Sequence, residues 1–320
     1  MSALLEVADL HLAFGGVKAV DGLSFQVHEA EIVSVIGPNG AGKTSAFNCI
    51  TGFYRATSGA ITIDGTDVTR LRPSAVAARG VSRTFQNVRL FGDLPVLDNV
   101  RAGTHLWLRQ HVFDALLHTP RYRRTEQVAT DEAHRWLDFV GLRADRTGPA
   151  RALPYGEQRR VEIARALARH PKLLLLDEPA AGLNHGEKLE LLELIRRIRD
   201  LGIAIVLIEH DMGLVMEVSQ RVVVLNFGKE IADGSPEAVR RDPAVIEAYL
   251  GSDDEPSGAT GDEPTGQTGD EERSGATGDG GPSGQTGDGG PSGQTGDGGP
   301  SGQTGDGGPS GLTEERTADA

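Results

Sequence analysis

The sequence predicts an α/β fold built around a mostly parallel β-sheet, and three observations support this class. Short apolar segments of strand length alternate with helical segments along residues 1–250. A glycine-rich turn, Gly37–Thr44, follows one strand-like segment and precedes a helical one. Two adjacent carboxylates, Asp177 and Glu178, close another strand-like segment. Because ligands collect at the carboxyl ends of strands in open parallel sheets, we expect the turn and the carboxylates to share one edge.

The expected strands are short, mainly apolar runs. They are Leu4–Leu12, Leu23–Val27, Ile32–Ile36, Ala60–Ile63, Leu173–Leu176, Ala204–Ile208 and Arg221–Asn226. The pair Asp64-Gly65 directly after the fourth run is a hairpin signal. The run Leu173–Leu176 is continuously apolar, which is typical of a strand buried on both faces.

The expected helices follow most of these strands in the chain. One begins at Thr44, and others cover Thr130–Val140, Glu157–Ala168 and Glu187–Leu201, with short helices from Met212, Pro236 and Pro243. The pattern turns helical between Gln86 and Ala152, most clearly at Thr130–Val140, which indicates a helical subdomain mounted on the sheet. We place this subdomain at about residues 88–168 and the whole folded domain at residues 1–251.

Residues 252–320 form a segment of very different composition. It has no aromatic residue, and the unit Ser-Gly-Gln-Thr-Gly-Asp-Gly-Gly-Pro repeats without change at Ser283–Pro291, Ser292–Pro300 and Ser301–Pro309. So little apolar surface cannot offset the entropy of the chain, and we expect a disordered tail. Glycine at every third position from Gly275 to Gly311 also fits a collagen triple helix, although the proline content is low for one.

The net charge and the cysteine content limit the partners and the cellular compartment that we expect for this protein. The formal net charge is −14, and residues 251–320 carry −13 of it, so the folded part is nearly neutral and we expect no nucleic-acid partner. Cys49 is the only cysteine, so no intramolecular disulfide can form. Nothing at the N-terminus resembles a signal peptide, and no apolar run approaches the ~20 residues of a membrane span. We therefore expect a cytoplasmic protein.

The glycine-rich turn fits the phosphate-binding pattern G-x-x-x-x-G-K-[ST] at every fixed position. Its residues and the one that follows are Gly37, Pro38, Asn39, Gly40, Ala41, Gly42, Lys43, Thr44 and Ser45. Backbone N–H groups of such a turn surround phosphate oxygens, and the helix N-terminus adds a favourable dipole. Lys43 is expected to reach the β- and γ-phosphates and Thr44 to hold Mg²⁺. The sequence therefore predicts binding of a nucleoside triphosphate.

The two carboxylates are expected to act on this nucleotide. Asp177 would anchor Mg²⁺ through its water shell, and Glu178 would polarise the attacking water. The alternative is a solvated acidic loop after a strand, which the phosphate-binding turn makes a poor explanation of the pair.

The order of these motifs resembles that of the ATP-binding subunits of ABC transporters, over Leu4–Gly251. The resemblance implies ATP and Mg²⁺ as ligands and an antiparallel β-subdomain beside the parallel core. It implies that Phe14 stacks on adenine and that Gln86 contacts Mg²⁺ and the attacking water. It also implies a switch role for His210. The alternatives are a core phenylalanine at Phe14 and an ordinary histidine at a strand end.

The same resemblance assigns residues 153–160 to the family signature, which binds the ATP of a second subunit. The residues expected to make this contact are Leu153, Tyr155, Gly156 and Gln158. The usual signature reads Leu-Ser-Gly-Gly-Gln, whereas this chain has Pro154 and Tyr155 at its second and third positions. Pro154 has neither a hydroxyl nor an N–H group, so one expected phosphate contact cannot form. Asn184 also stands where the family often has aspartate.

Several strings are similar to the larger ATPase of branched-chain amino acid importers. They are residues 82–91, 178–184, 208–212 and 242–251, together with the long stretch Gly103–Arg124. This similarity implies a second ATPase subunit, expected to be a paralogue, two membrane permeases and an extracytoplasmic binding protein. The protein would lie on the inner face of the cell membrane. Import of urea, amides or other amino acids, lipid or lipopolysaccharide export, and a soluble ABC ATPase of DNA repair or translation remain as alternatives.

Overall fold

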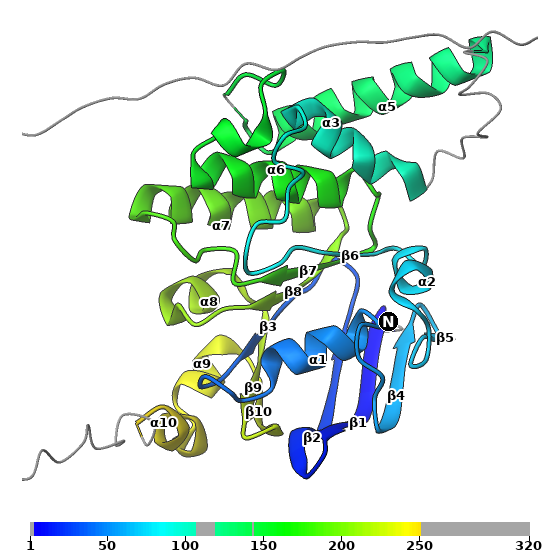
Figure 1. The fold of residues 1–320 in the computed structure, drawn as a ribbon. Coiled ribbons are helices and arrows are strands. Elements are labelled where there is room, and N and C mark those ends of the chain that lie inside the picture. The colour runs from blue at the N-terminus through cyan, green and yellow to red at the C-terminus, as the bar shows by residue number, and fades with distance from the viewer. Residues whose placement is uncertain (1–2, 107–118, 143, 251–320) are drawn as a thin grey trace, which may run out of the picture. The chain divides into compact units, whose positions relative to one another are not determined.

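The computed structural model describes residues 3–106, 119–142 and 144–250, and in these ranges helices pack against two β-sheets (Figure 1). The expectations for the tail, residues 252–320, lie outside the described residues, as does much of the stretch Gly103–Arg124. No helix within the described ranges is long and apolar enough to cross a membrane.

The larger sheet has six strands in the order β10-β9-β3-β8-β7-β6. They are β3 (Ile32–Ile36), β6 (Val81–Arg83), β7 (Leu173–Asp177), β8 (Ala204–Ile208), β9 (Arg221–Asn226) and β10 (Lys229–Gly234). Neighbouring strands from β9 to β6 are parallel, and only the edge strand β10 runs antiparallel to its neighbour. The prediction of a mostly parallel sheet is confirmed. The short strand β6 and the polar edge strand β10 were not expected from the sequence.

The smaller sheet is antiparallel, with the order β2-β1-β4-β5. Its strands are β1 (Leu5–Phe14), β2 (Val17–Val27), β4 (Ser58–Ile63) and β5 (Thr66–Asp67). The first two strands form one long hairpin in which Phe14 pairs with Val17 across Gly15-Gly16. The sequence predicted shorter strands here, because polar residues on the exposed side of β2 hide the pattern. Gly15 has φ 58°, a left-handed conformation that glycine adopts readily.

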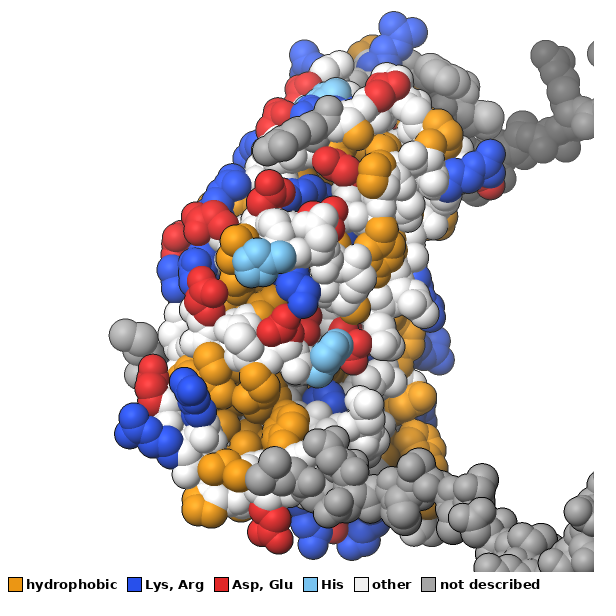
Figure 2. Space-filling view, turned by 90° about the vertical axis from the view of Figure 1, so that its left-hand side faces the viewer, with side chains coloured by type: hydrophobic (Ala, Val, Ile, Leu, Met, Phe, Trp, Pro, Cys, Tyr) orange, Lys and Arg blue, Asp and Glu red, His pale blue; other side chains and the backbone are white. Residues whose placement is uncertain are grey.

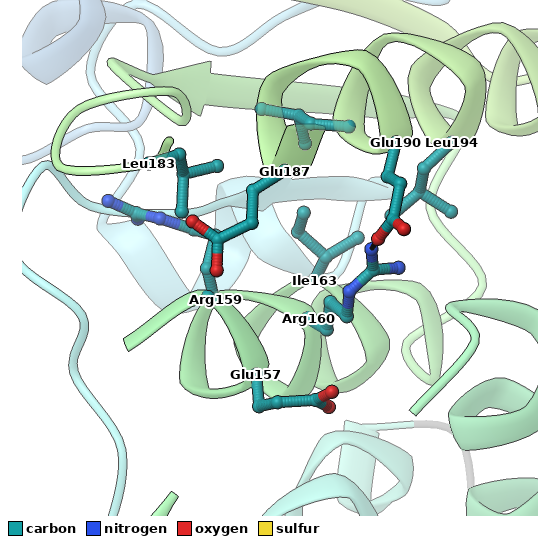
Figure 3. A pocket seen from close by; sticks show the side chains of 10 residues that line it. Glu157, Arg159, Arg160, Ile163, Leu183, Glu187, Glu190 and Leu194 are labelled. Carbon is teal, nitrogen blue, oxygen red and sulfur yellow. Dashed lines mark hydrogen bonds and ion pairs between the residues drawn. The ribbon is translucent and has the colours of Figure 1, made fainter. Parts of the chain in front are cut away.

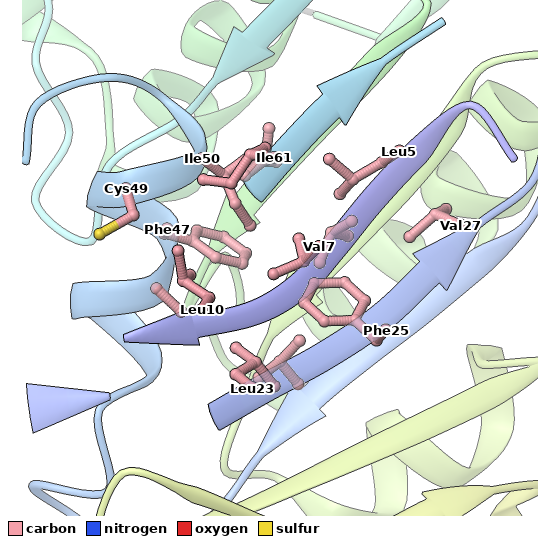
Figure 4. Close-up of a cluster of buried hydrophobic side chains, with 14 of the residues drawn as sticks. Leu5, Val7, Leu10, Leu23, Phe25, Val27, Phe47, Cys49, Ile50 and Ile61 are labelled. Carbon is pink, nitrogen blue, oxygen red and sulfur yellow. The ribbon is translucent and has the colours of Figure 1, made fainter. Parts of the chain in front are cut away.

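The helices cover both faces of the parallel sheet. They are α1 (Lys43–Ile50), α2 (Pro73–Ala77), α3 (Val96–Arg101), α5 (Pro120–Phe139), α6 (Tyr155–Leu167), α7 (His185–Asp200), α8 (Met212–Val218), α9 (Pro236–Arg240) and α10 (Pro243–Leu250), with 3₁₀ turns at Ala102–Leu106 and Ala150–Ala152. Helix α1 and the antiparallel sheet pack on one face, where Phe47 and Ile50 meet apolar side chains of β1, β2 and β4 (Figure 4). Helices α3, α5, α6 and α7 pack on the other face.

Strand β7 shows why its sequence is continuously apolar. Leu173 and Leu175 belong to the core beneath the antiparallel sheet, whereas Leu174 and Leu176 belong to the core beneath α6 and α7. All four side chains are buried, because successive residues of a strand point to opposite faces and both faces are covered. This strand therefore carries Asp177 and Glu178 out of a rigid, fully packed segment.

Candidate nucleotide site

The turn Gly37–Thr44 joins β3 to α1 at the carboxyl end of the parallel sheet. Two of its glycines are required by close approach of the backbone. A Cβ on Gly37, which has φ 147°, would lie 2.0 Å from the carbonyl oxygen of Leu225, and a Cβ on Gly42, φ 100°, would lie 2.2 Å from that of Ala19. Gly42 is the N-cap of α1 and offers no side chain to the first amides of the helix. Those amides are therefore available to an anion.

Lys43 lies folded against this turn. Its Nζ donates hydrogen bonds to the carbonyl oxygens of Gly37, at 2.7 Å, and Pro38, at 2.9 Å. Burial lowers the pKa of Lys43, while the charges of Glu178 and Asp177 act in the opposite direction. A cavity of about 390 Å³ beside it is lined by the turn from Asn39 to Ser45, by Val17–Ala19, by Glu178 and by Phe227. The turn and the ammonium of Lys43 therefore line a cavity that suits phosphate groups.

Phe14 lies at the end of β1 with half of its surface exposed. Its ring meets that of Tyr54 edge to face, with 5.2 Å between the ring centroids. The alternative of a core phenylalanine is thus wrong. Val17, three residues on, lines the cavity beside the turn. Stacking of Phe14 on adenine stays a prediction.

Asp177 forms a buried ion pair that the sequence did not reveal. Nη2 of Arg83 lies 2.7 Å from Oδ2 of Asp177, and both side chains are almost fully buried. Nη1 of Arg83 donates to Oδ1 of Asn48 at 2.7 Å, which fastens the pair to α1. The guanidinium also lies over the rings of Phe47 and Phe85. Arg83 comes from β6, and only the tertiary pairing of β6 with β7 brings it to Asp177.

Glu178 contacts two other predicted catalytic residues. Nε2 of Gln86 donates to its Oε2 at 2.8 Å, and Nδ1 of His210 lies 3.9 Å from the same oxygen. Glu178 has φ 46°, an uncommon conformation for a residue with a side chain, and its N–H donates to the carbonyl of Ile208. The structure therefore brings Gln86, Glu178 and His210 together at the ends of β6, β7 and β8.

Glu209 is a second buried carboxylate that sequence reasoning missed. Its Oε1 accepts the N–H of Ala180 at 2.9 Å, and its Oε2 accepts that of His210 at 3.2 Å. Burial raises the pKa of Glu209, and these backbone hydrogen bonds act in the opposite direction. One carboxylate thus ties the loop after Glu178 to the backbone of His210. The signal in the sequence that could have revealed Glu209 is a charged residue directly after an apolar strand.

The signature turn opens helix α6. Pro154 is the N-cap of the helix, and Gln158 donates the first helical N–H to its carbonyl. Nε2 of Gln158 donates to the carbonyl of Leu153 at 2.8 Å, so this side chain closes its own turn. No residue of the signature turn among the described residues lines the cavity beside Lys43 and the phosphate-binding turn of the same chain.

Gly156 permits close packing of this turn on helix α7, whose Glu187 side chain extends toward α6 (Figure 3). A Cβ at this position would lie 2.5 Å from Oε1 of Glu187. Glu187 is held by a capping box with Asn184, in which each side chain accepts the backbone N–H of the other residue. Asn184, noted as a departure from the family pattern, therefore has a clear local role as the N-cap of α7.

The donor set fits a hard divalent cation beside the phosphates. Thr44 offers a hydroxyl at the start of α1, and Gln86 offers an amide oxygen. Asp177 offers its Oδ1, since Arg83 is paired with Oδ2 of the same carboxylate. Mg²⁺ prefers such oxygen ligands and is usually held by one or two protein groups together with substrate phosphates. When bound, Mg²⁺ neutralises charge on the phosphates.

Comparisons with known proteins agree with this geometry. The ABC transporter family model matches residues 20–181, and the model of the branched-chain amino acid ATP-binding cassette transporter matches residues 229–255. The high-affinity branched-chain amino acid transport ATP-binding protein BraF of Pseudomonas aeruginosa is 47% identical over 78% of this chain and 98% of its own length. The corresponding protein LivG of Salmonella typhimurium is 49% identical over the same shares.

Solved structures show the same similarity. A nucleotide-free ATP-binding cassette from an ABC transporter has a TM-score of 0.68 and 29% identity, covering 78% of this chain and 99% of its own. An ATP-binding cassette in its ADP conformation has a TM-score of 0.69 and 30% identity, covering 78% of this chain and all of its own. The resemblance inferred from the sequence motifs is confirmed, and the chain belongs to the ABC transporter family.

Proposed function

We propose that this protein is the ATP-hydrolysing subunit of an importer for branched-chain or closely related amino acids. The observation that carries the proposal is the contact of Gln86 with Glu178, and the approach of His210, at the strand ends beside the phosphate-binding turn. In this arrangement an amide and an imidazole both lie near one oxygen of a carboxylate, and that carboxylate lines the cavity beside the phosphate-binding turn. This is the chemistry that hydrolysis of a terminal phosphate needs.

Each group has a distinct role in the reaction. The amides of the turn and the ammonium of Lys43 bind the β- and γ-phosphates, and Thr44 and Asp177 supply oxygen ligands to Mg²⁺. Glu178 orients a water molecule and accepts its proton as it attacks the γ-phosphate. Gln86 holds Glu178 through its amide, and His210 lies near the same carboxylate oxygen, Oε2.

The cavity beside the phosphate-binding turn has no signature residue among the described residues that line it, which supports a head-to-tail pair of ATPase subunits. In such a pair, the first amides of α6 in one subunit would complete the ATP site of the other. One face of the described residues has acidic and histidine side chains near its centre and hydrophobic side chains gathered below them (Figure 2). The family relationship makes a paralogous subunit the expected partner.

A groove near Gln86 is the proposed contact with the membrane permeases. It has a volume of about 250 Å³ and is lined by residues of α2 and β6, by the turn after α1 and by Arg169. Phe53, which is more than half exposed, lies on this groove, and its ring packs edge to face on Phe85, the neighbour of Gln86. A permease segment in this groove would touch Arg83, the partner of Asp177, and Phe53, whose ring packs on Phe85 in the loop of Gln86. The subunit would thus be held on the cytoplasmic face of the membrane by its permeases.

The substrate class rests on the relatives. Identity is 47% to BraF of Pseudomonas aeruginosa and 49% to LivG of Salmonella typhimurium, both named for branched-chain amino acids, and 34% to the lipopolysaccharide export ATP-binding protein of Haemophilus influenzae. The greater similarity to the first group favours amino acid import over export of lipid or lipopolysaccharide.

The decisive experiment is isolation of the intact complex. The full-length protein is expected to copurify with two permeases and an extracytoplasmic binding protein, and calorimetry of that binding protein should show tight binding of leucine, isoleucine or valine. A binding protein that retains urea or an amide instead would contradict the substrate class. A protein that purifies without permeases and hydrolyses ATP as fast as the assembled complex would contradict the transport role.

A further inference from the structure

Tyr155 stands at the signature position where the family usually has glycine, and its side chain makes contacts that glycine cannot make. It is the first residue of helix α6. Its ring lies beside Gly182, where an added Cβ would be 3.2 Å from the ring carbon Cε1. Its hydroxyl accepts a hydrogen bond from Nη2 of Arg159 at 2.9 Å. Tyr155 therefore joins the signature turn to the loop that follows Glu178 and to a side chain one turn along the helix.

Arg159 carries this connection to the loop of Gln86. Its side chain is only 1% exposed, and Nη2, which donates to Tyr155, also donates to the carbonyl oxygen of Gln86 at 2.7 Å. Nη1 donates to the carbonyl of Phe85 at the same distance. The guanidinium is planar and its donors have fixed directions, so a shift of Arg159 must move these carbonyls with it. The side chain of Gln86 then continues to Glu178 at 2.8 Å.

Glu162 balances the buried charge and completes the attachment. Its Oε2 lies 2.8 Å from Nη1 of Arg159, and its Oε1 accepts the N–H of Arg89 at 3.3 Å. Burial raises the pKa of Glu162, while the charge of Arg159 acts in the opposite direction. The pair therefore fastens residues 85–89 to helix α6 without the help of Tyr155. The tyrosine hydroxyl adds only the link to the signature turn.

We propose that Tyr155 and Arg159 are positioning residues for ATP hydrolysis, which couple the signature turn to Gln86 and through it to Glu178. The proposal rests on the function proposed above, in which the signature binds the ATP of a second subunit. Phosphate bound at the first amides of α6 moves or fixes the turn that carries Tyr155. The hydroxyl and the guanidinium transmit that position to the carbonyl of Gln86. Each subunit then aligns its own Glu178 according to the nucleotide that its signature holds.

The test is a double-mutant cycle on ATP hydrolysis by the full-length protein, assembled with the subunits that copurify with it. Tyr155→Phe removes one hydroxyl and keeps the ring beside Gly182. We expect kcat to fall about tenfold, equivalent to about 1.4 kcal/mol, with KM for ATP unchanged. Tyr122→Phe on α5 removes the same group elsewhere and should leave kcat unchanged. A purely structural role of Tyr155 would lower the melting temperature and spare kcat, and this result would overturn the proposal.

The second arm of the cycle uses Gln86→Ala, which removes the side chain that reaches Glu178 but keeps the carbonyl that accepts from Arg159. If Tyr155 acts through Gln86, Tyr155→Phe should have no further effect on kcat in the Gln86→Ala background. Effects that multiply in the double variant would show that the two residues act independently, which would overturn the coupling. The substrate class does not enter this test, since the measured quantity is ATP hydrolysis and not transport.

Arg159→Lys provides an independent variant of the same link. Lysine keeps the positive charge beside Glu162, but one ammonium cannot reproduce the directions in which the planar guanidinium reaches Phe85, Gln86 and Tyr155. We expect a larger loss of kcat than for Tyr155→Phe, and no additional loss when both substitutions are combined. A variant that melts like the parent protein and hydrolyses ATP at the parent rate would overturn the role of Arg159.

Discussion

Replacement of Glu178 by glutamine tests its proposed role as the general base. In the structure Oε2 of Glu178 accepts from Gln86 at 2.8 Å, and the amide oxygen of a glutamine can accept the same hydrogen bond. The substitution therefore removes the charge and the basicity but preserves the contact between the loops. General-base catalysis contributes about 10²–10⁴ in rate, which corresponds to about 2.7–5.4 kcal/mol of barrier. We expect kcat to fall by that factor.

Binding of ATP should survive the same substitution. Glu178 is one of two carboxylates whose charge opposes the lowering of the pKa of Lys43 by burial. In the glutamine variant, less negative charge of the protein neutralises the ammonium of Lys43, which remains free to bind phosphate. The Kd for ATP should therefore stay equal or decrease slightly. Steady-state phosphate release and calorimetry measure the two quantities, with Glu193→Gln on the exposed side of α7 as the matched control. Hydrolysis within about threefold of the parent rate would refute the assignment, since a general base contributes far more. The variant should also accumulate as a dimer with bound ATP, which light scattering can detect.

Three further expectations concern other parts of the chain. Lys43→Ala should raise the Kd for ATP at least about tenfold, because the ammonium that Gly37 and Pro38 hold beside the cavity is lost. Replacement of the exposed Lys172 by alanine serves as the control, and an unchanged Kd of the Lys43 variant in calorimetry would contradict this role. Burial raises the pKa of the Cys49 thiol to about 11, so iodoacetamide at about pH 8 should modify it only in the unfolded protein, which mass spectrometry can follow. A chain that ends after residue 251 should keep its melting temperature and kcat, and a lower value of either would show that the tail contributes to the folded domain.

The sequence predicts the parts of the site whose information is local. The turn Gly37–Thr44 and the strand Leu173–Leu176 each carry their pattern within a few residues, so both were correctly placed. Arg83 and Glu209 were not recognised, because each acts through a contact between strands that lie far apart in the chain. The long β1–β2 hairpin was underestimated for a different reason. Its second strand is polar on the exposed face, and burial of the other face appears only when the sheet is formed.

Buried charges in this site connect loops mainly through backbone atoms. Glu209 accepts N–H groups from the loop after Glu178 and from His210, and Arg159 donates to two carbonyls of the Gln86 loop. An apolar side chain of similar volume would remove the ionic group but leave these backbone groups buried and unsatisfied, at about 1–3 kcal/mol each.

Burial disfavours a charged side chain, yet Arg159 and Glu209 both occupy well-packed positions. The need to satisfy the buried backbone groups that they contact explains why charged residues are found there. It also means that the loops cannot move independently. A displacement of the signature turn moves the Tyr155 hydroxyl that accepts from Arg159, and a displacement of the loop after Glu178 moves the N–H group of Ala180 that donates to Glu209. Because Gln86 and His210 both lie against Oε2 of Glu178, Arg159 and Glu209 together control the position of this carboxylate.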